Sequence, residues 1–262
     1  MLTLSKGHFL GQTSTSFAVN EVMISRTAYH APVFEGWHCH EHLHLTLLLE
    51  GGNEESRSGS CVEVMAGNLL WYHSGEMHRN AKTRHPSVNI NLEIPEVLLR
   101  ERGLSFHTLT ASPLLQDKAK YAMLKLLREI TIADMHTGTA VDALLNNIFT
   151  APAVKANIPP QWVATVAQLL QDRWADTVSL DEMAAAAGVH PVTISKYFPS
   201  YFGCSLGYYL RKIKIDRALV LLRTGKYSLT EVAYRCGFFD QSHFIRVFKS
   251  HTGMLPKVYR QL

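Results

Sequence analysis

The sequence is poor in cysteine and has no long apolar run. Its 262 residues include four cysteines, Cys39, Cys61, Cys204 and Cys236, and no two of them form a CxxC pair. This spacing argues against a disulfide framework and favours free thiols in a reducing compartment. No apolar stretch approaches the roughly 20 residues that span a bilayer, and the first residues lack the basic-then-apolar order of a signal peptide. We therefore expect a cytoplasmic protein without a membrane partner.

Acidic residues are scarce in the C-terminal part of the chain. Residues 159–262 contain 13 lysines and arginines and 7 aspartates and glutamates, a net charge of +6, whereas the residues before them carry 13 and 15, a net charge of −2. A basic region of this kind suits a polyanion such as DNA. An ordinary solvated surface can carry the same charge, so the charge alone does not establish DNA binding.

Two consecutive prolines, Pro159 and Pro160, mark a domain boundary. A chain of 262 residues fits one large domain or two ordinary ones. A proline pair stops a helix and favours an extended link. We therefore predict two domains, residues 1–157 and residues 158–262.

The N-terminal domain reads as strands followed by helices. Short apolar or alternating runs are separated by turn signals, at residues 43–49, 61–65, 69–72 and 88–94. Strands at this spacing predict a small antiparallel barrel or sandwich. Apolar residues then follow helical spacing over 121–133 and 141–149. Each of these helices has one apolar face, which either covers the barrel or forms a dimer contact.

One stretch of the C-terminal domain occurs twice. Ser179 and Ser228 each open a Ser-x-x-Glu sequence, the capping box that satisfies the first backbone donors of a helix. Each copy then runs to a glycine, Gly188 or Gly237, where a left-handed turn can end the helix, and a second short helix follows. This is the helix-turn-helix pattern, whose second helix enters a DNA major groove.

We place the two helix-turn-helix units at about residues 179–202 and 228–251, joined by a basic helix over 205–223. Two recognition helices held by one connecting helix can enter successive segments of the major groove, about 34 Å apart. The alternative is an ordinary helical bundle with solvated polar residues. The duplicated capping box and glycine argue against it.

The outer face of each second helix supplies the predicted DNA-binding residues. Arg246 suits a guanine or a phosphate, Gln241 suits adenine, and Lys249 suits a phosphate. The inward face is predicted to hold Ile194, Phe198 and Phe248. The full predicted set is Val192, Thr193, Ser195, Lys196, Gln241, Ser242, Ile245, Arg246 and Lys249.

The second copy ends in a signature segment. From Cys236 it reads Cys-Gly-Phe-Phe-Asp-Gln-Ser-His-Phe-Ile-Arg-Val-Phe-Lys-Ser-His-Thr-Gly-Met-Leu-Pro. With this segment and its first-copy counterpart, residues 161–262 resemble the AraC/XylS family of transcription regulators. The resemblance implies seven helices with two helix-turn-helix units and double-stranded DNA as partner. It also implies an effector-sensing domain, a homodimer, and RNA polymerase as a partner if the protein is an activator.

One position departs from the family pattern. Pro199 lies inside the first recognition helix, where the family often has lysine or arginine. A proline there removes a helix hydrogen bond, so we expect a kink and one phosphate contact fewer. The better-defined DNA recognition is therefore predicted for the second copy.

Histidines recur at every second position from His38 to His44, and on one strand all four would face the same side. Together with a later Gly-x2-His at Gly75 and His78, they resemble the two cupin motifs. A departure is that His44 stands where cupin enzymes carry a glutamate. The resemblance implies an α+β fold: an N-terminal cupin-like antiparallel β-barrel with covering helices, and a C-terminal all-α domain with two helix-turn-helix motifs.

Three interpretations of His38, His40, His44 and His78 stay open. One is a site for a divalent metal, zinc, nickel or iron, because neutral imidazoles suit these ions. Another is a polar pocket that binds a small-molecule effector without metal. The third is a barrel skeleton whose histidines hydrogen-bond internally.

The leading functional hypothesis is a sequence-specific DNA-binding transcription regulator, controlled by a small molecule or metal bound in the N-terminal barrel, and not an enzyme. The alternative is a cupin metalloenzyme, a dioxygenase or isomerase, with a DNA-binding appendage. The missing acidic ligand at His44 argues against that alternative. A third hypothesis is a constitutive DNA-binding protein whose barrel only dimerises.

Overall fold

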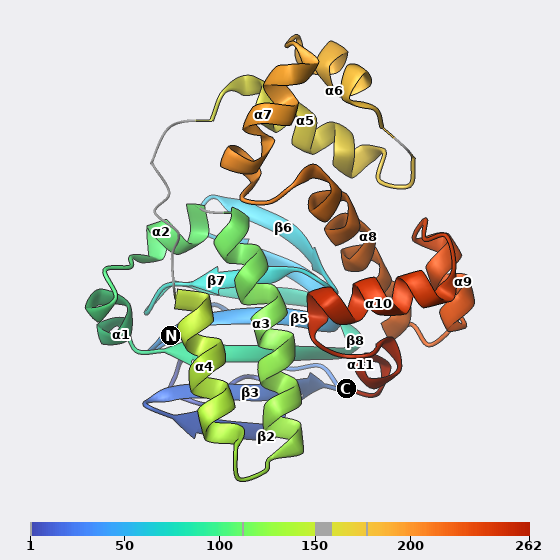
Figure 1. The fold of residues 1–262 in the computed structure, drawn as a ribbon. Helices are drawn as coiled ribbons and strands as arrows, with labels where there is room; N and C mark the ends of the chain where they lie inside the picture. The colour runs from blue at the N-terminus through green and yellow to red at the C-terminus, as the bar shows by residue number, and fades with distance from the viewer. Residues whose placement is uncertain (1, 112, 150–158, 177) are drawn as a thin grey trace. The chain divides into compact units, whose positions relative to one another are not determined.

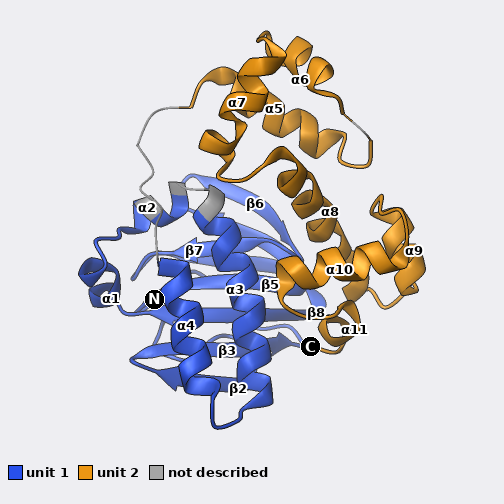
Figure 2. Cartoon of the chain, in the orientation of Figure 1, with its two compact units in different colours: residues 1–151 blue, residues 152–262 orange. Residues whose placement is uncertain are grey.

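The computed structural model describes residues 2–111, 113–149, 159–176 and 178–262. The chain divides into two compact units, Met1–Ala151 (the first unit) and Pro152–Leu262 (the second unit), coloured separately in Figure 2. The predicted boundary between residues 157 and 158 lies outside the described residues. None of the described helices combines the length and the apolar character needed to cross a bilayer.

The first unit is built on a curled, half-barrel sheet (Figure 1). Its strands are β1 (Leu2–Leu4), β2 (Gln12–Val19), β3 (Val22–Tyr29), β4 (His38–His40), β5 (Leu43–Arg57), β6 (Ser60–Met65), β7 (Leu69–Tyr72) and β8 (His78–Ile94). The order β1-β4-β8-β3-β2 forms one path, and β5 pairs with β6, β7 and β8. β1 pairs with β4 in parallel, and the other pairs are antiparallel.

The two faces of the sheet differ in chemistry because side chains alternate along a strand. In β8, Val88, Ile90 and Leu92 alternate with Ser87, Asn89 and Asn91, and all of them are buried. The helices α3 (Pro113–Ile132) and α4 (Thr137–Phe149) lie side by side across the sheet (Figure 1), and α3 contacts β2, β3 and β8. Of the two roles that the sequence left open for these helices, the structure shows them covering the sheet, and the dimer contact stays a prediction. Ser87, Asn89 and Asn91 line the pocket of this unit.

Several strand boundaries differ from the prediction. Residues 50–53, which supply the turn signal after the predicted run 43–49, do not form a turn, because β5 continues to Arg57 through register shifts around Gly51 and Gly52, both at positive φ. Glycine relieves the backbone strain of these irregularities, so the strand bends instead of reversing. Two short helices, α1 (Glu96–Glu101) and α2 (Phe106–Ala111), were not predicted at all.

The histidine stretch is not one straight strand either. β4 ends at His40, the chain bends at Glu41 and His42, and β5 begins at Leu43. The bend turns His42 out of the pocket while His38, His40 and His44 stay buried inside it. The prediction that all four histidines share one face is therefore wrong for His42.

The second unit is helical. Its helices are α5 (Gln161–Asp172), α6 (Leu180–Ala187), α7 (Pro191–Phe202), α8 (Leu206–Arg223), α9 (Leu229–Arg235), α10 (Gln241–Thr252) and α11 (Pro256–Gln261). Both capping boxes are formed: Ser179 bonds reciprocally with Glu182, and Ser228 with Glu231. Gly188 and Gly237 take φ of 65° and 70°, so each helix pair is joined by the left-handed glycine turn that the sequence predicts.

Candidate DNA interface and histidine pocket

The helix α10 has one polar face and, on its other side, buried aromatic side chains. Its first backbone donors are capped by Asp240, whose Oδ1 accepts from the His243 N–H at 2.7 Å. Phe244 and Phe248 are fully buried, which fixes the rotation of the helix. The predicted DNA-facing residues then divide: Ser242, Arg246 and Lys249 are exposed, whereas Gln241 and Ile245 are half-buried.

The side chain of Gln241 already has a partner within the unit. Its Oε1 accepts from the hydroxyl of Thr230 on α9 at 2.6 Å. Reading an adenine through two hydrogen bonds uses both the oxygen and the nitrogen of the amide. Gln241 must therefore break this contact to read adenine in that way, or it can donate its amide N–H alone.

The helix α7 carries less charge on its outer face. Ile194 and Phe198 are buried as predicted, Val192, Ser195 and Lys196 are exposed, and Thr193 is half-buried. The ammonium of Lys196 lies 5.2 Å from the centroid of the Tyr197 ring. The helix runs unbroken from Pro191 to Phe202 with Pro199 inside it.

One basic side chain of α8 has a structural task that the sequence does not reveal. The Lys214 ammonium donates to the carbonyl of Gly237 at 2.7 Å, and so ties the connecting helix to the turn between α9 and α10. A Cβ on Gly237 would approach this ammonium to 3.1 Å. Lys214 therefore positions the second helix pair.

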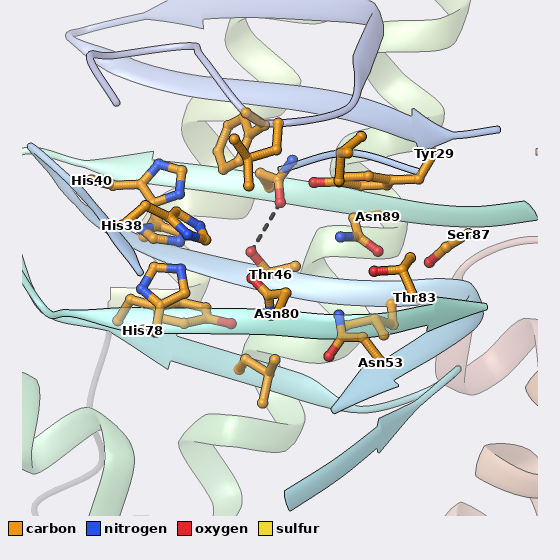
Figure 3. A pocket seen from close by; sticks show the side chains of 18 residues that line it. Tyr29, His38, His40, Thr46, Asn53, His78, Asn80, Thr83, Ser87 and Asn89 are labelled. Atoms are coloured by element: carbon orange, nitrogen blue, oxygen red, sulfur yellow. Dashed lines mark hydrogen bonds between the residues drawn. The ribbon is translucent and has the colours of Figure 1, made fainter. Parts of the chain in front are cut away.

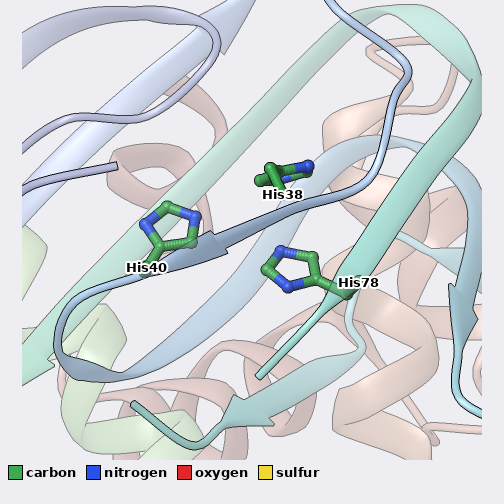
Figure 4. Close-up of side chains that lie close together, drawn as sticks. All are labelled: His38, His40 and His78. Atoms are coloured by element: carbon green, nitrogen blue, oxygen red, sulfur yellow. The ribbon is translucent and has the colours of Figure 1, made fainter. Parts of the chain in front are cut away.

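The polar interior of the first unit contains a histidine pocket. His38 and His40 come from β4, His44 from β5 and His78 from the start of β8, where His38 is paired with His78. The rings of His38, His40 and His78 lie around a shared space (Figure 4), and each offers a nitrogen within 4.8 Å of the others. His44 does not belong to this set of three; it stacks on Tyr72 with ring centroids 4.4 Å apart.

Three of these rings are oriented by the same local contact. The Nδ1 of each lies near the carbonyl two residues earlier: His38 with Gly36 at 3.0 Å, His78 with Glu76 at 2.9 Å, and His44 with His42 at 3.3 Å. A carbonyl oxygen only accepts, so in the neutral ring Nδ1 carries the hydrogen and Nε2 keeps its lone pair. The lone pair of Nε2 is therefore available as a ligand in His38 and His78.

The histidines are kept neutral by their surroundings. Burial, together with the neighbouring His78 and His38, lowers the pKa of His40 to about 3. Burial likewise lowers the pKa of His38, His44 and His78. Neutral imidazole is the form that binds metal.

Away from the histidines the pocket is lined by a row of amides and hydroxyls (Figure 3) and by the apolar residues Phe9, Leu10, Val33, Leu48 and Leu70. The Thr46 hydroxyl donates to Asn91 at 2.9 Å, and the Asn91 amide donates to Thr27 at 3.1 Å. The other polar residues of this row are Tyr29, Asn53, Asn80, Thr83, Ser87 and Asn89. None of these residues belongs to the predicted site, although the alternation of Ser87, Asn89 and Asn91 with apolar residues is a signal for some of them.

A buried carboxylate lies behind the pocket. Glu55 is 1% exposed and accepts from the Tyr72 hydroxyl at 2.6 Å, the Asn80 amide at 2.9 Å and the Arg57 guanidinium at 2.7 Å. Arg57 also bonds Glu76 at 3.0 Å and lies 4.4 Å from the Tyr72 ring centroid. This network holds the side chains of Tyr72 and Asn80 in place. It contains two carboxylates, Glu55 and Glu76, and one guanidinium, Arg57.

The second unit contains capped helix pairs, glycine turns and an exposed basic face on α10. These are the features of a helix-turn-helix DNA-binding domain. Residues 183–262 match a family model described as a helix-turn-helix domain. The HTH-type transcriptional activator RhaS of Escherichia coli is 33% identical over 92 residues, which are 35% of this chain and 33% of RhaS. This region is therefore a helix-turn-helix domain, in line with the predicted resemblance to the AraC/XylS regulators.

Two solved structures are also similar. A transcriptional regulator with an AraC-type DNA-binding domain from Chromobacterium violaceum is 23% identical, with a TM-score of 0.36, over 38% of this chain and 89% of that chain. ToxT of Vibrio cholerae is 11% identical, with a TM-score of 0.38, over 95% of this chain and 98% of that chain. These TM-scores are too low to place the whole fold.

The aligned segment spans only a third of the length of RhaS, so the likeness concerns the DNA-binding region. The similar proteins of known function are transcriptional regulators and not enzymes.

Proposed function

We propose that this protein is a sequence-specific DNA-binding transcription regulator, controlled by a ligand bound in the N-terminal half-barrel. The observation that carries the proposal is the α9–α10 pair, which lies within the region matched by the family model and exposes Arg246 on a rigid helix. The α6–α7 pair is proposed as a second helix-turn-helix unit that enters an adjacent segment of the major groove.

The base-reading role belongs to the exposed faces of α7 and α10. Arg246 is suited to a guanine edge and Lys249 to a phosphate, while α7 offers Lys196 as its charged side chain. The second unit therefore carries the more specific contacts on α10. We further propose a cytoplasmic homodimer that contacts RNA polymerase if it acts as an activator.

The ligand in the half-barrel is either a small polar molecule or a metal ion. The amide and hydroxyl row supports a small molecule, because Asn53 and Asn89 each have a buried Oδ1 with no hydrogen-bond partner among the described residues. The three converging histidines support a metal ion.

The proposal predicts that Arg246→Ala weakens specific DNA binding. A duplex selected by the full chain from a random pool would serve as the target, with affinity measured by fluorescence anisotropy. Losing a base-reading arginine should cost about 1–3 kcal/mol on this duplex. Lys257→Ala is the matched control, because it removes one exposed charge from α11. Equal affinity of Arg246→Ala and the unaltered protein would refute the assignment of α10.

A further inference from the structure

The donor set of the histidine pocket is that of a transition-metal site. His38, His40 and His78 are all buried, and their nearest ring nitrogens lie within 4.8 Å of one another. Zinc binds histidine nitrogen at about 2.0–2.1 Å, so donors on opposite sides of one ion lie about 4 Å or less apart. Small side-chain movements therefore bring the three nitrogens onto one ion. Two of the rings are held by backbone carbonyls, as in metal sites whose ligands are fixed by a second hydrogen bond.

His40 supplies an independent observation. It is 3% exposed, and its Nδ1 has no hydrogen-bond partner among the residues that the structure describes. Leaving a buried polar atom unbonded costs about 1–3 kcal/mol. The Phe9 ring lies 4.9 Å from the His40 ring, between centroids, and shields it. A ligand in the pocket that engages His40 would remove this cost.

The size of the pocket separates an ion from an organic ligand. The cavity has a volume of about 40 Å³. One water molecule needs roughly 10–15 Å³ on this measure, whereas sites for drug-sized ligands occupy about 300–1,000 Å³. The cavity therefore has room for an ion with a few water molecules, and an effector of sugar size would have to displace its walls.

The nearby charge also suits a cation. Glu55 and Glu76 face a single cationic partner, Arg57, so the network has an excess of one negative charge. Glu55 lies next to the pocket, since it accepts hydrogen bonds from Tyr72 and Asn80, which both line it. A divalent ion bound by three neutral rings would be partly balanced by this carboxylate.

We infer that the ligand of the half-barrel is a divalent transition-metal ion held by His38, His40 and His78, and that this ion is the signal to which the protein responds. The three rings leave at least one coordination position to water, as in metal sites with an open position. His44 is then a neighbour that packs against Tyr72 and not a ligand. The signalling role rests on the function proposed above; the binding site does not.

The test uses the full chain, purified without an affinity tag and stripped with a chelator. Zinc binding is measured by calorimetry, and cobalt binding by its visible absorption, which reports the coordination geometry. We expect one ion per chain, and at least a 100-fold loss of affinity in both His40→Ala and His78→Ala. His42→Ala is the matched control, because His42 lies outside the pocket two positions from His40 and should bind zinc like the unaltered protein.

Two outcomes would overturn the site. One is the absence of stoichiometric binding in the unaltered protein, and the other is equal binding in His40→Ala, His78→Ala and His42→Ala, which marks adsorption by surface histidines. Circular dichroism shows whether each variant is folded, and His38→Gln provides a third ligand change if an alanine variant is not.

The signalling role has a separate readout. Zinc should change the affinity for the selected duplex at least tenfold in the unaltered protein and in His42→Ala, but not in His40→Ala. If zinc binds and DNA affinity stays constant, the ion is structural and the signalling inference fails. If the metal-free protein binds the duplex specifically yet takes no zinc, only the metal inference is lost.

Discussion

Replacing Arg57 with alanine would test how the pocket is held together. Arg57 bonds Glu55 at 2.7 Å, and the side chains of the two residues are 27% and 1% exposed. Breaking a buried ion pair by removing one partner costs about 3–5 kcal/mol. Because Arg57 is partly exposed and Glu55 keeps its bonds to Tyr72 and Asn80, we expect a cost at or just below the lower end of that range, about 2–3 kcal/mol.

The loss of stability is best measured with a probe that reports on the first unit within the full chain, because a chain of two units need not unfold in one step. The urea dependence of hydrogen exchange in β5 and β8 gives the free energy of unfolding of this unit. Lys82→Ala is the control, because Lys82 pairs with Glu54 at 2.7 Å with a side chain 74% exposed, and solvent screens that pair. Its removal should leave the free energy almost unchanged.

A second substitution separates the charge from the packing. Adding Glu55→Gln to Arg57→Ala removes the uncompensated carboxylate while keeping a side chain that can bond Tyr72 and Asn80. We expect the double variant to be more stable than Arg57→Ala. If Arg57→Ala costs no more than Lys82→Ala, or if the double variant is the less stable of the two, the account of Glu55 as a buried paired charge is wrong.

Two further predictions concern pH and the glycines. Burial raises the pKa of Glu93 from 4.5 to about 7, so the folded state holds a proton that the unfolded state releases, and the contribution of Glu93 to stability falls as pH rises from about 4.5 to 7. The four pocket histidines, whose pKa values are lowered by burial, contribute in the opposite direction. In urea titrations at several pH values, the free energy of unfolding of Glu93→Gln, relative to that of the unaltered protein, should therefore rise over this range. Gly188, at φ 65°, and Gly138, at the start of α4, both have open space where an added Cβ would lie. Thermal unfolding should show Gly188→Ala destabilised by about 1–2 kcal/mol through backbone strain and Gly138→Ala stabilised by about 0.4–1 kcal/mol; the opposite order would contradict the assigned backbone.

The second unit was predictable because its signals are local. A capping box involves residues three apart, and the left-handed turn needs a glycine close by in the chain. Ser179, Glu182 and Gly188 therefore predict both ends of their helix from a short stretch of sequence. The buried phenylalanines of α10 follow from helical spacing in the same way. Local sequence did not reveal the Gln241–Thr230 bond, which joins two helices across the turn.

The pocket was less predictable because its residues meet only through strand pairing. His38 and His78 were identified from their motifs, but their pairing across β4 and β8 is set by the register of the sheet. Glu55 was missed because the glycines before it read as a turn, whereas the strand continues through them. The burial of its carboxylate depends on partners up to 25 residues away.

The most direct test of the central claim is the affinity of the full chain for its selected duplex, compared with a scrambled duplex of the same length and composition. We predict binding at least about 10³-fold tighter to the selected duplex at physiological salt. We also predict a steep loss of affinity on both duplexes as salt rises, because lysine and arginine contacts release counterions. Equal affinity for the two duplexes at every salt concentration would contradict the account of this protein as a sequence-specific regulator.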